Sequence, residues 1–373
     1  MPSARIVVVL QTPKDVHSAV LQCYLTLGAE LTSRGHSLAI VTPDDFPVAR
    51  RFGGRWTPFT YPVAVSRWLR ANARQVDVVV SHSYACWLAA STSAIGRTPL
   101  VVAFHGLEPM YHHELRELYR RTGRALSWRY RFLQEQLMPR WLRAACVRAS
   151  LVVCLNAAER EEILARGWTT PGGLAIFAHG VRDAYFLTRA DRPVARLLFV
   201  GQWLPMKGVT YLRDAASDLL RRHPGLSLDC VGTLAAAGTV LADFPPDLRH
   251  RVNVRPRVDQ SELPQIYADA DLFLFPSLYE GFGRALLEAM AARLPIVSTT
   301  VGIAGEALSD GESCLVVPRH DAPAMVAAVD RLIGDEALRA RLGATAHAIA
   351  RTYRESDRIE EYADLLLAVA GRR

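Results

Sequence analysis

Two glutamates flank the start of a predicted helix in the second half of the chain. Glu280 lies in Glu280-Gly-Phe-Gly283-Arg284, after the apolar run Leu272–Phe275, and Glu288 lies about a turn inside the helix that follows. Glycines let a backbone approach a ligand closely, and the free N–H groups of a helix start attract anions. Eight residues of helix span about 12 Å, whereas the carboxylates of a retaining glycosidase lie about 5–5.5 Å apart. The spacing therefore favours two carboxylates that hold hydroxyl groups at opposite ends of one long ligand.

A lysine follows an earlier apolar run in a similar position. Leu197–Val200 leads into Gly201-Gln202-Trp-Leu-Pro-Met-Lys207-Gly208, and a helix pattern begins after it. A lysine beside a helix start adds a full charge to the partial positive charge of the helix end, which suits a phosphate. The order of glycine and lysine excludes a Walker A loop. Taken alone, the segment fits a surface lysine equally well.

The elements that must position these residues alternate between short apolar runs and amphipathic helix patterns. A helix is predicted over Ala19–Arg34, ended by Gly35, and a last helix over Asp357–Ala370. Alternation of strands and helices indicates βαβ units and parallel sheets. The expected strands are Arg5–Leu10, Ser37–Thr42, Val76–Ser81, Leu100–Phe104, Leu151–Leu155 and Leu174–Phe177, then Leu197–Val200, Leu226–Val231, Val252–Arg255, Leu272–Phe275, Ile296–Ser298 and Leu315–Val317.

The pattern restarts after the polar stretch Asp183–Pro193, which predicts two α/β domains, each with a doubly wound parallel sheet. We expect a first domain over 1–185, a second domain over 186–352, and a C-terminal helix over 353–373 that packs back on the first domain. In open α/β sheets, ligands bind at the carboxyl ends of the strands.

Length and composition agree with this organisation. The chain has 373 residues, of which 50% are hydrophobic and 22% charged, enough for two buried cores. The sequence has no uncharged apolar run of 18 residues, and its start lacks the features of a signal peptide. The six cysteines are scattered without a Cys-x-x-Cys pair, as in a reduced cytoplasmic protein.

Glu280-Gly-Phe-Gly283 with Glu288 resembles the E-x7-E signature of the family 4 retaining glycosyltransferases. The resemblance implies a GT-B fold, in which two Rossmann-like domains face each other across a cleft. It also implies that the second domain, 186–352, mainly holds a nucleotide-diphosphate sugar donor and the first domain, 1–185, mainly holds the acceptor. It extends over nearly the whole chain, through Leu31-Thr-Ser-Arg-Gly35-His36, His105-Gly106, Ala178-His-Gly180-Val181, Phe199-Val-Gly201, Gly232, Glu306 and Asp310-Gly with Val317-Pro318.

Carried over residue by residue, the resemblance gives each site residue a role. Lys207 would hold the donor diphosphate, Glu288 the ribose hydroxyls, and Glu280 the transferred sugar. His105 would reach that sugar from the first domain; a histidine buried in the core is the alternative. The expected catalytic residues are thus Glu280, His105 and Lys207, and the donor-binding set is Gly201, Gln202, Lys207, Gly232, Glu280, Gly281, Phe282, Gly283, Arg284 and Glu288.

Two positions depart from the family pattern. Gln202 stands where family members usually carry arginine, so one fixed cation would face the leaving group in place of two. Arg284 follows the glycine turn, where an apolar residue is more common, and we expect it to compensate. The family's Gly-Gly turn after the first strand is replaced by Pro13-Lys-Asp-Val-His17-Ser18, which leaves the contacts of that loop open.

No metal or other cofactor is expected. Asp269-Ala-Asp271 has the letters of a metal-binding pair, but it precedes its strand, at the wrong end for a ligand site in a parallel sheet. A dehydrogenase would need Gly-x-Gly-x-x-Gly after a strand, and the sequence has none. A catalytically reduced sugar-nucleotide-binding protein remains the rival to a hexose-transferring enzyme.

The net charge of +7 is concentrated in one segment, where Glu114–Arg148 holds nine arginines against three glutamates. A nucleic-acid-binding protein would spread its basic residues over a wider face. Three interpretations of 111–148 remain: a solvated helix face, contact with an anionic membrane or lipid-linked acceptor at the inner membrane face, and an anionic soluble acceptor. The donor is expected to be a UDP- or GDP-sugar, and the acceptor a glycan, a lipid-linked sugar or a natural product.

Overall fold

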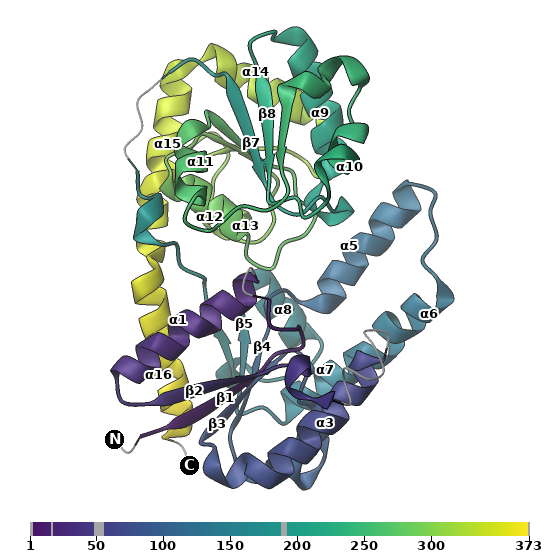
Figure 1. Cartoon of the computed structure of the whole chain (residues 1–373), viewed down its shortest axis with the longest axis vertical. Coiled ribbons are helices and arrows are strands. Elements are labelled where there is room, and N and C mark those ends of the chain that lie inside the picture. Colours follow the sequence, from purple (N-terminus) through teal and green to yellow (C-terminus); the bar gives the residue numbers. More distant parts are fainter. Residues whose placement is uncertain (1–2, 16–17, 48–55, 188–191, 372–373) are drawn as a thin grey trace. The chain divides into compact units, whose positions relative to one another are not determined.

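The computed structural model describes residues 3–15, 18–47, 56–187 and 192–371. The chain forms two compact units. Unit 1 comprises Met1–Ala178 and Ser356–Arg373, and unit 2 comprises His179–Glu355. Each unit contains a six-stranded sheet with helices on its faces (Figure 1).

Unit 1 is built on an all-parallel sheet in the order β2-β1-β3-β4-β5-β6. Its four inner strands, β1, β3, β4 and β5, are almost completely buried and rich in valine, as expected where helices cover both faces, whereas the edge strands β2 and β6 are partly exposed. Their bounds are β1 Arg5–Val9, β2 Ser37–Val41, β3 Val78–His82, β4 Leu100–Ala103, β5 Leu151–Cys154 and β6 Leu174–Ile176.

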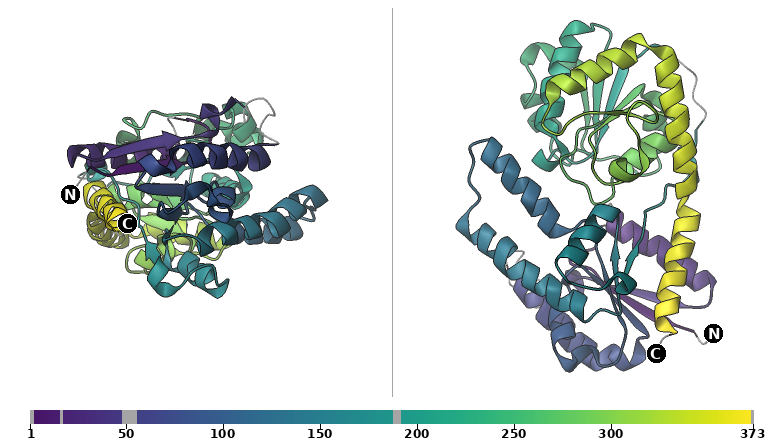
Figure 2. Two further views of the ribbon diagram at one scale, coloured as in Figure 1. Left: turned by 90° about the horizontal axis from the view of Figure 1, so that it is seen from below. Right: turned by 180° about the vertical axis from the view of Figure 1, so that it is seen from behind.

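Helices cover the unit 1 sheet on two sides (Figure 2). One core cluster joins α1 and α16 to the sheet, so the C-terminal helix belongs to unit 1. The other cluster joins α3, α4 and α7. The helices are α1 Ala19–Ser33, α3 Thr57–Asn72, α4 Trp87–Ser91, α5 Glu108–Arg121, α6 Trp128–Arg131, α7 Met138–Val147, α8 Ala157–Ala165 and α16 Glu355–Ala370.

A helical hairpin projects from unit 1 (Figures 1 and 2). α5 forms one arm, and α6 continues through the π-helical turn Phe132–Leu137 into α7 to form the other. The arms are joined by a 2.6 Å hydrogen bond between the Tyr130 hydroxyl and His112 Nδ1 and by an ion pair between Arg116 and Glu135.

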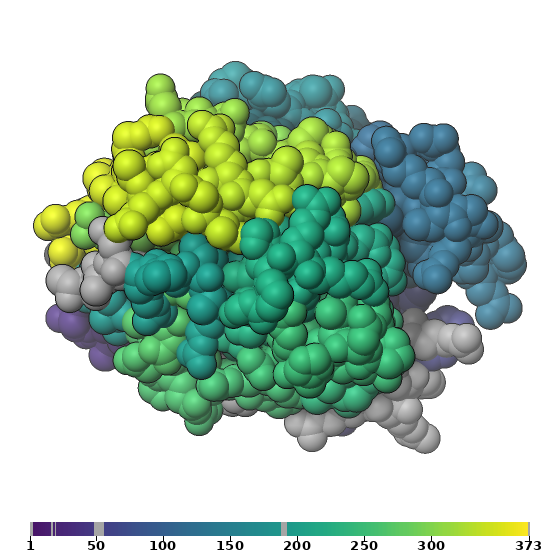
Figure 3. Space-filling model, turned by 90° about the horizontal axis from the view of Figure 1, so that it is seen from above, coloured from purple at the N-terminus to yellow at the C-terminus, as the bar shows by residue number. Residues whose placement is uncertain are grey.

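Unit 2 repeats the architecture with the strand order β12-β11-β10-β7-β8-β9, again all parallel. α9 and α14 pack side by side over its core (Figure 3). The strands are β7 Arg196–Val200, β8 Ser227–Val231, β9 Val252–Arg255, β10 Leu272–Phe275, β11 Ile296–Ser298 and β12 Leu315–Val316. The helices are α9 Val209–Arg222, α10 Ala237–Ala242, α11 Leu263–Asp269, α12 Arg284–Ala291, α13 Ala304–Ala307, α14 Ala322–Gly334 and α15 Glu336–Ala350.

The predicted strands are confirmed, each within two residues of its expected bounds. The predicted end of the first helix is confirmed as well, since Gly35 adopts a φ of +81°, which glycine tolerates without strain. No helix among the described residues combines the length and the apolar character needed to cross a membrane.

The strand orders locate a ligand-binding position in each unit. A doubly wound sheet opens a crevice at the carboxyl ends of the two neighbouring strands from which the chain winds in opposite directions. That switch point lies between β1 and β3 in unit 1 and between β7 and β10 in unit 2. The loops that follow these four strands are therefore the places to look for chemistry.

Candidate functional site

The loops after β7 and β10 meet in an ion pair. Lys207 Nζ lies 2.6 Å from Glu280 Oε1 and 2.8 Å from Oε2, so one ammonium group binds both carboxylate oxygens. The Glu280 side chain is 10% exposed and that of Lys207 30%, which makes this a half-buried pair at the edge of the sheet. The two residues that the sequence pattern singled out separately are thus in direct contact at the switch point of unit 2.

Glycine makes this close approach possible. Gly208, directly after the lysine, has a φ of +71°, and a Cβ there would lie 1.9 Å from the carbonyl oxygen of Pro276. Gly302, after β11, has a φ of +56°, and its Cβ would lie 2.3 Å from the carbonyl oxygen of Phe282. No side chain fits at either position, so three loops pack backbone against backbone around Glu280.

Neighbouring hydroxyl groups fix the Glu280 carboxylate. The Ser277 hydroxyl donates a 2.8 Å hydrogen bond to Glu280 Oε1, and the Thr299 hydroxyl donates a 2.6 Å bond to the carbonyl oxygen of Ser277. Both residues are buried. The carboxylate is therefore held by a lysine on one side and by a serine on the other.

Glu288 lies on α12 in a separate environment. The hydroxyl of the fully buried Tyr267 donates a 2.9 Å hydrogen bond to Glu288 Oε2. Burial raises the pKa of Glu288, and the positive charges of Arg284 and Arg182 and the tyrosine hydrogen bond oppose that rise. Arg284 stands one helical turn before Glu288. Its charge also acts on His179, whose pKa is lowered to about 3 mainly by burial.

The remaining residues that were expected to bind the donor lie on the loops of unit 2 that follow β7, β8 and β10. Gln202 is exposed in the β7 loop, between Gly201 and the rest of the lysine segment. Gly232 follows β8 with a φ of +69° and donates a 2.8 Å backbone hydrogen bond to Arg255. Gly281, Phe282 and Gly283 form the buried turn before α12, and the Phe282 ring packs edge-on against His179 at 5.4 Å.

His105 lies in unit 1, just beyond β4. Its Nε2 is 3.1 Å from the hydroxyl of Tyr24, and its ring lies 5.2 Å from that of His82, at the end of β3. The loop that carries it is fixed by the buried Glu159, whose Oε1 accepts a 2.8 Å hydrogen bond from the backbone N–H of Leu107. Part of the other departing loop, Val16 and His17, lies outside the described residues.

The Asp271 side chain fixes the neighbouring backbone and pairs with an arginine. Its Oδ2 accepts hydrogen bonds from the backbone N–H groups of Ala195 at 2.9 Å and Arg196 at 2.8 Å, and its Oδ1 is paired with Arg192 at 2.5 Å. The Asp269 side chain accepts a bond from Gln265. Within the described ranges, no three His, Cys, Asp or Glu side chains gather in a way that could hold a metal ion.

Three residues that support the site were not predicted from the sequence. In the sequence, Tyr267 is indistinguishable from an ordinary aromatic core residue of a helix. Thr299 is indistinguishable from any other residue that follows a strand. Ser277 lies inside the Pro276–Gly283 loop that drew attention to Glu280, and a hydroxyl three residues from a buried carboxylate is the one signal that would have identified it.

Comparison with known proteins agrees with the fold. The model of Glycosyltransferase Family 4 matches residues 22–184, and that of Glycosyl transferases group 1 matches residues 194–335. The D-inositol 3-phosphate glycosyltransferase of Kineococcus radiotolerans is 30% identical over 310 residues, which are 74% of this chain and 68% of that protein. The alpha-D-kanosaminyltransferase of Streptomyces kanamyceticus is 33% identical over 171 residues, 44% of this chain and 42% of that protein.

Among solved structures, Anabaena HepE in complex with UDP superimposes with a TM-score of 0.72 at 18% identity, over 98% of this chain and 100% of that one. The expected fold class is confirmed: two six-stranded parallel sheets with flanking helices form a GT-B fold. The expected family is confirmed too, and this chain belongs to the family 4, or group 1, glycosyltransferases.

Proposed function

We propose that this protein is a retaining glycosyltransferase that moves a hexose-type sugar from a UDP- or GDP-sugar to a hydroxyl group of a glycan, a lipid-linked sugar or a natural product. The observation that carries the proposal is the Lys207–Glu280 pair at the switch point of unit 2. A cation for a diphosphate and a carboxylate for sugar hydroxyls stand side by side there. HepE, which shares the fold, was solved with UDP, and this supports the choice of nucleotide.

The pair suggests how donor binding is organised. A diphosphate beside Lys207 would take over the ammonium group as its counter-ion. The Glu280 carboxylate, still held by Ser277, would then be able to accept hydrogen bonds from the hydroxyls of the sugar. Glu288, farther along α12, would accept hydrogen bonds from the ribose. Donor binding would thus replace the Lys207–Glu280 ion pair by a contact of Lys207 with the diphosphate and a contact of Glu280 with the sugar, with little rearrangement of the loops.

Chemistry at the anomeric carbon is proposed to proceed on one face. As the bond from the sugar to the diphosphate breaks, the departing phosphate oxygen takes the proton of the attacking acceptor hydroxyl, and that hydroxyl oxygen bonds to the anomeric carbon. Lys207, with Arg284 in place of the missing arginine at 202, would stabilise the charge that develops on the diphosphate. His105 is kept in the proposal as a catalytic residue for the transferred sugar.

Product analysis tests the stereochemical part of the proposal. The anomeric configuration of the product, read by NMR, should equal that of the donor sugar, and inversion would rule the mechanism out. Turnover should also survive EDTA, because the diphosphate charge is assigned to Lys207, Arg284 and helix N-termini. Loss of turnover on chelation that Mg²⁺ or Mn²⁺ restores would overturn the metal-independent part.

A catalytically reduced sugar-nucleotide-binding protein is the second candidate, and exposed Gln202 at the usual arginine position is the observation that favours it. Hydrolysis of UDP-glucose without acceptor distinguishes the two. The enzyme should release glucose slowly, whereas a binding protein would retain the intact donor.

We also propose peripheral contact between segment 111–148 and the anionic inner face of a membrane. Along α6, the π-helical turn and α7, exposed residues recur every three or four positions and form one helix face, made of Trp128, Phe132, Gln136, Arg140, Arg143 and Val147 and extended by the exposed Arg148. We call this the arm face. Arg129 and Arg131 are exposed beside this face. Trp128 is 72% exposed, whereas Trp141 and Leu142 on the opposite side belong to the core. An amphipathic helix with exposed aromatics and arginines is typical of a helix that lies in a membrane interface.

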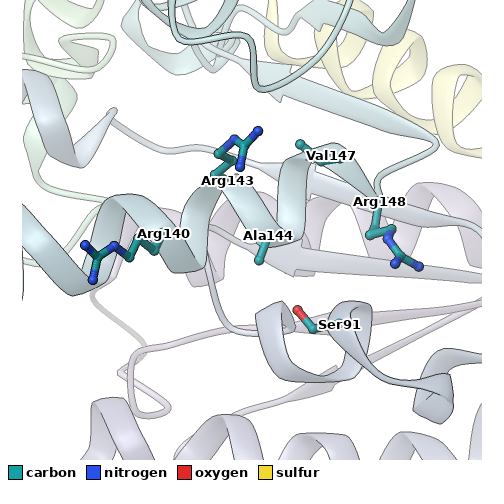
Figure 4. A pocket seen from close by; sticks show the side chains of 6 residues that line it. All are labelled: Ser91, Arg140, Arg143, Ala144, Val147 and Arg148. Carbon is teal, nitrogen blue, oxygen red and sulfur yellow. The ribbon is translucent and has the colours of Figure 1, made fainter.

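The basic part of the arm face lines a shallow pocket of about 320 Å³ with Ser91 of α4 (Figure 4). Arg140, Arg143 and Arg148 line it, and within the described part of the chain no carboxylate lies within ion-pair distance of them. Basic residues near an anionic membrane contribute about 1 kcal/mol each. The charge of the pocket thus suits the phosphate groups of anionic lipids.

Vesicle co-sedimentation tests this contact. The protein should bind vesicles of phosphatidylcholine with phosphatidylglycerol, and bind phosphatidylcholine alone far less. Trp128→Ser with Phe132→Ser, and separately Arg140→Gln with Arg143→Gln, should each weaken binding, whereas Ile176→Ser, at another exposed apolar residue of unit 1, should not. Equal sedimentation with both vesicle types, or none with either, would leave the arm face as a solvated surface or as the site of a soluble anionic acceptor.

A further inference from the structure

The switch point of unit 1 holds three buried polar groups that lack hydrogen-bond partners among the described residues. They are Nε2 of Gln11, Nδ1 of His82 and Oε2 of Glu108. Gln11 follows β1, His82 ends β3, and Glu108 lies just beyond β4, at the start of α5. β1 and β4 both pair with β3, so the three residues come from adjoining strand ends.

Only one of the two carboxylate oxygens of Glu108 accepts a hydrogen bond from another side chain. The Ser83 hydroxyl donates a short hydrogen bond to its Oε1, while its Oε2 stays without a partner. Ser83 has a φ of +53°, an uncommon conformation for a residue with a side chain, and is itself fixed through Ser81, whose hydroxyl donates a 3.0 Å bond to the carbonyl oxygen of Ser83. Strained backbone of this kind clusters at binding sites and active sites.

A buried acceptor atom without a donor is costly unless a ligand completes it. Glu108 offers a carboxyl oxygen and Gln11 an amide N–H. His82 stays neutral because burial lowers its pKa to about 4, so it offers a ring nitrogen without adding charge. This combination accepts and donates hydrogen bonds as a polyol requires. Burial raises the pKa of Glu108, and the Ser83 hydroxyl and the backbone N–H of Glu108 itself oppose that rise; among the described residues no arginine or lysine contributes.

We infer that Gln11, His82 and Glu108 bind the acceptor, and that Glu108 selects a neutral or ammonium-bearing polyol over a phosphorylated one. The inference rests on the proposed glycosyltransferase function and adds the chemical class of the acceptor. It separates this chain from the relative that is named for D-inositol 3-phosphate. A carboxylate repels a phosphate and attracts an ammonium group, so one residue accounts for both parts of the selection.

The selection should depend on pH. Burial raises the pKa of Glu108 to about 7, so its carboxyl is protonated below that pH and ionised above it. The ionisable groups near it include His82, the Tyr84 phenol after β3 and the Cys146 thiol on α7. Burial lowers the pKa of His82 and raises the pKa of the phenol and of the thiol, so all three stay neutral near pH 7. Discrimination against phosphate should therefore increase as the pH rises through 7.

Acceptor kinetics test the inference. With saturating UDP-glucose, kcat and KM are measured for myo-inositol, an amino-inositol and myo-inositol 3-phosphate, on either side of pH 7. The wild type should favour the unphosphorylated compounds by about tenfold or more in kcat/KM above pH 7. Glu108→Gln should narrow that ratio chiefly through KM and make it independent of pH. Glu117→Gln, at a half-buried residue of the same helix that pairs with Arg120 and Arg121, should leave that ratio unchanged.

The outcomes separate this inference from the proposed function. Binding of UDP and slow hydrolysis of UDP-glucose test the donor site alone. If both occur while the phosphorylated polyol is preferred, while the three acceptors react equally, or while none reacts, the acceptor inference is wrong and the donor site stands. If no UDP- or GDP-sugar is bound or hydrolysed, the proposed function itself is wrong. A wild-type preference that Glu108→Gln leaves unaltered would remove Glu108 from the selection.

Discussion

The strand ends of the two sheets use their polar groups in opposite ways. At the switch point of unit 2 the charged groups have protein partners, since Lys207 is bound to Glu280 and Glu288 to Tyr267. At the switch point of unit 1 buried atoms of Gln11, His82 and Glu108 have none among the described residues. A site for a charged ligand can hold its own counter-charges until the ligand replaces them. A site for a neutral ligand has no charge that a protein group must balance, so its hydrogen-bonding groups can stay without partners until the ligand binds.

The largest expected effect comes from breaking the pair in unit 2. Lys207→Ala should lower turnover by about 10²–10³, the usual loss when a fixed group that stabilises transition-state charge is removed. Steady-state kinetics measure it. Arg222→Ala is the matched control, because Arg222 forms an exposed ion pair with Asp218 on α9 of the same unit, away from the strand ends. Similar losses in the two variants would show that the Lys207 pair has no special role.

The contact between the unit 2 loops can be broken without touching a charged group. Gly208→Ala should destabilise the protein by more than the roughly 1–3 kcal/mol of left-handed strain, because its Cβ would meet Pro276 at 1.9 Å. Gly311→Ala, with the same φ of +71° and open space around it, should show the strain alone. Urea unfolding compares the two variants. Equal losses of unfolding free energy in the two variants would mean that the loops of unit 2 move apart without cost.

Substitutions of the two glutamates of unit 2 should affect different quantities, one the affinity for the nucleotide and the other the transfer of the sugar. Glu288→Ala should weaken UDP binding by about 1.5–3 kcal/mol, the range for hydrogen bonds to a charged group. Glu280→Ala should leave UDP affinity nearly unchanged and depress turnover. Calorimetric titration with UDP, followed by kinetics, measures both effects. Equal losses of UDP affinity in the two variants would contradict the assignment of Glu288 to the ribose.

The smallest expected effect concerns the missing arginine. Arg284→Ala should lower turnover by about tenfold or more if its guanidinium replaces the arginine usual at 202, since such a group acts on transition-state charge. Gln202→Arg should restore part of that loss in the double variant. The charge of Arg284 also acts on Glu288, so UDP affinity must be followed alongside turnover. If turnover of Arg284→Ala stays within a factor of a few of the wild type, or if Gln202→Arg restores none of the loss, Arg284 does not replace the arginine that is usual at position 202.

Much of the fold could be predicted because its signals are local. Apolar runs such as Leu272–Phe275 mark buried parallel strands, and glycines such as Gly35 mark helix ends. The Lys207–Glu280 contact could not be predicted, because 73 residues separate the two and their meeting depends on β7 lying beside β10. The same holds for Ser83 and Glu108, where a serine with positive φ meets a glutamate on another loop. Sequence patterns singled out Lys207 and Glu280 as candidates, and the strand order determines that they touch.

Nucleotide binding tests the central claim most directly. Thermal unfolding of the wild-type protein in EDTA is measured with UDP, GDP, ADP and dTDP, alone and as their sugars, beside Lys207→Ala and Glu288→Ala. UDP or GDP should raise the midpoint, because a ligand at 100 times its Kd stabilises the folded state by about 2.7 kcal/mol, and both variants should lose most of that increase. No stabilisation of the wild type by any of these nucleotides, or equal stabilisation of wild type and variants, would contradict a donor site at the unit 2 switch point.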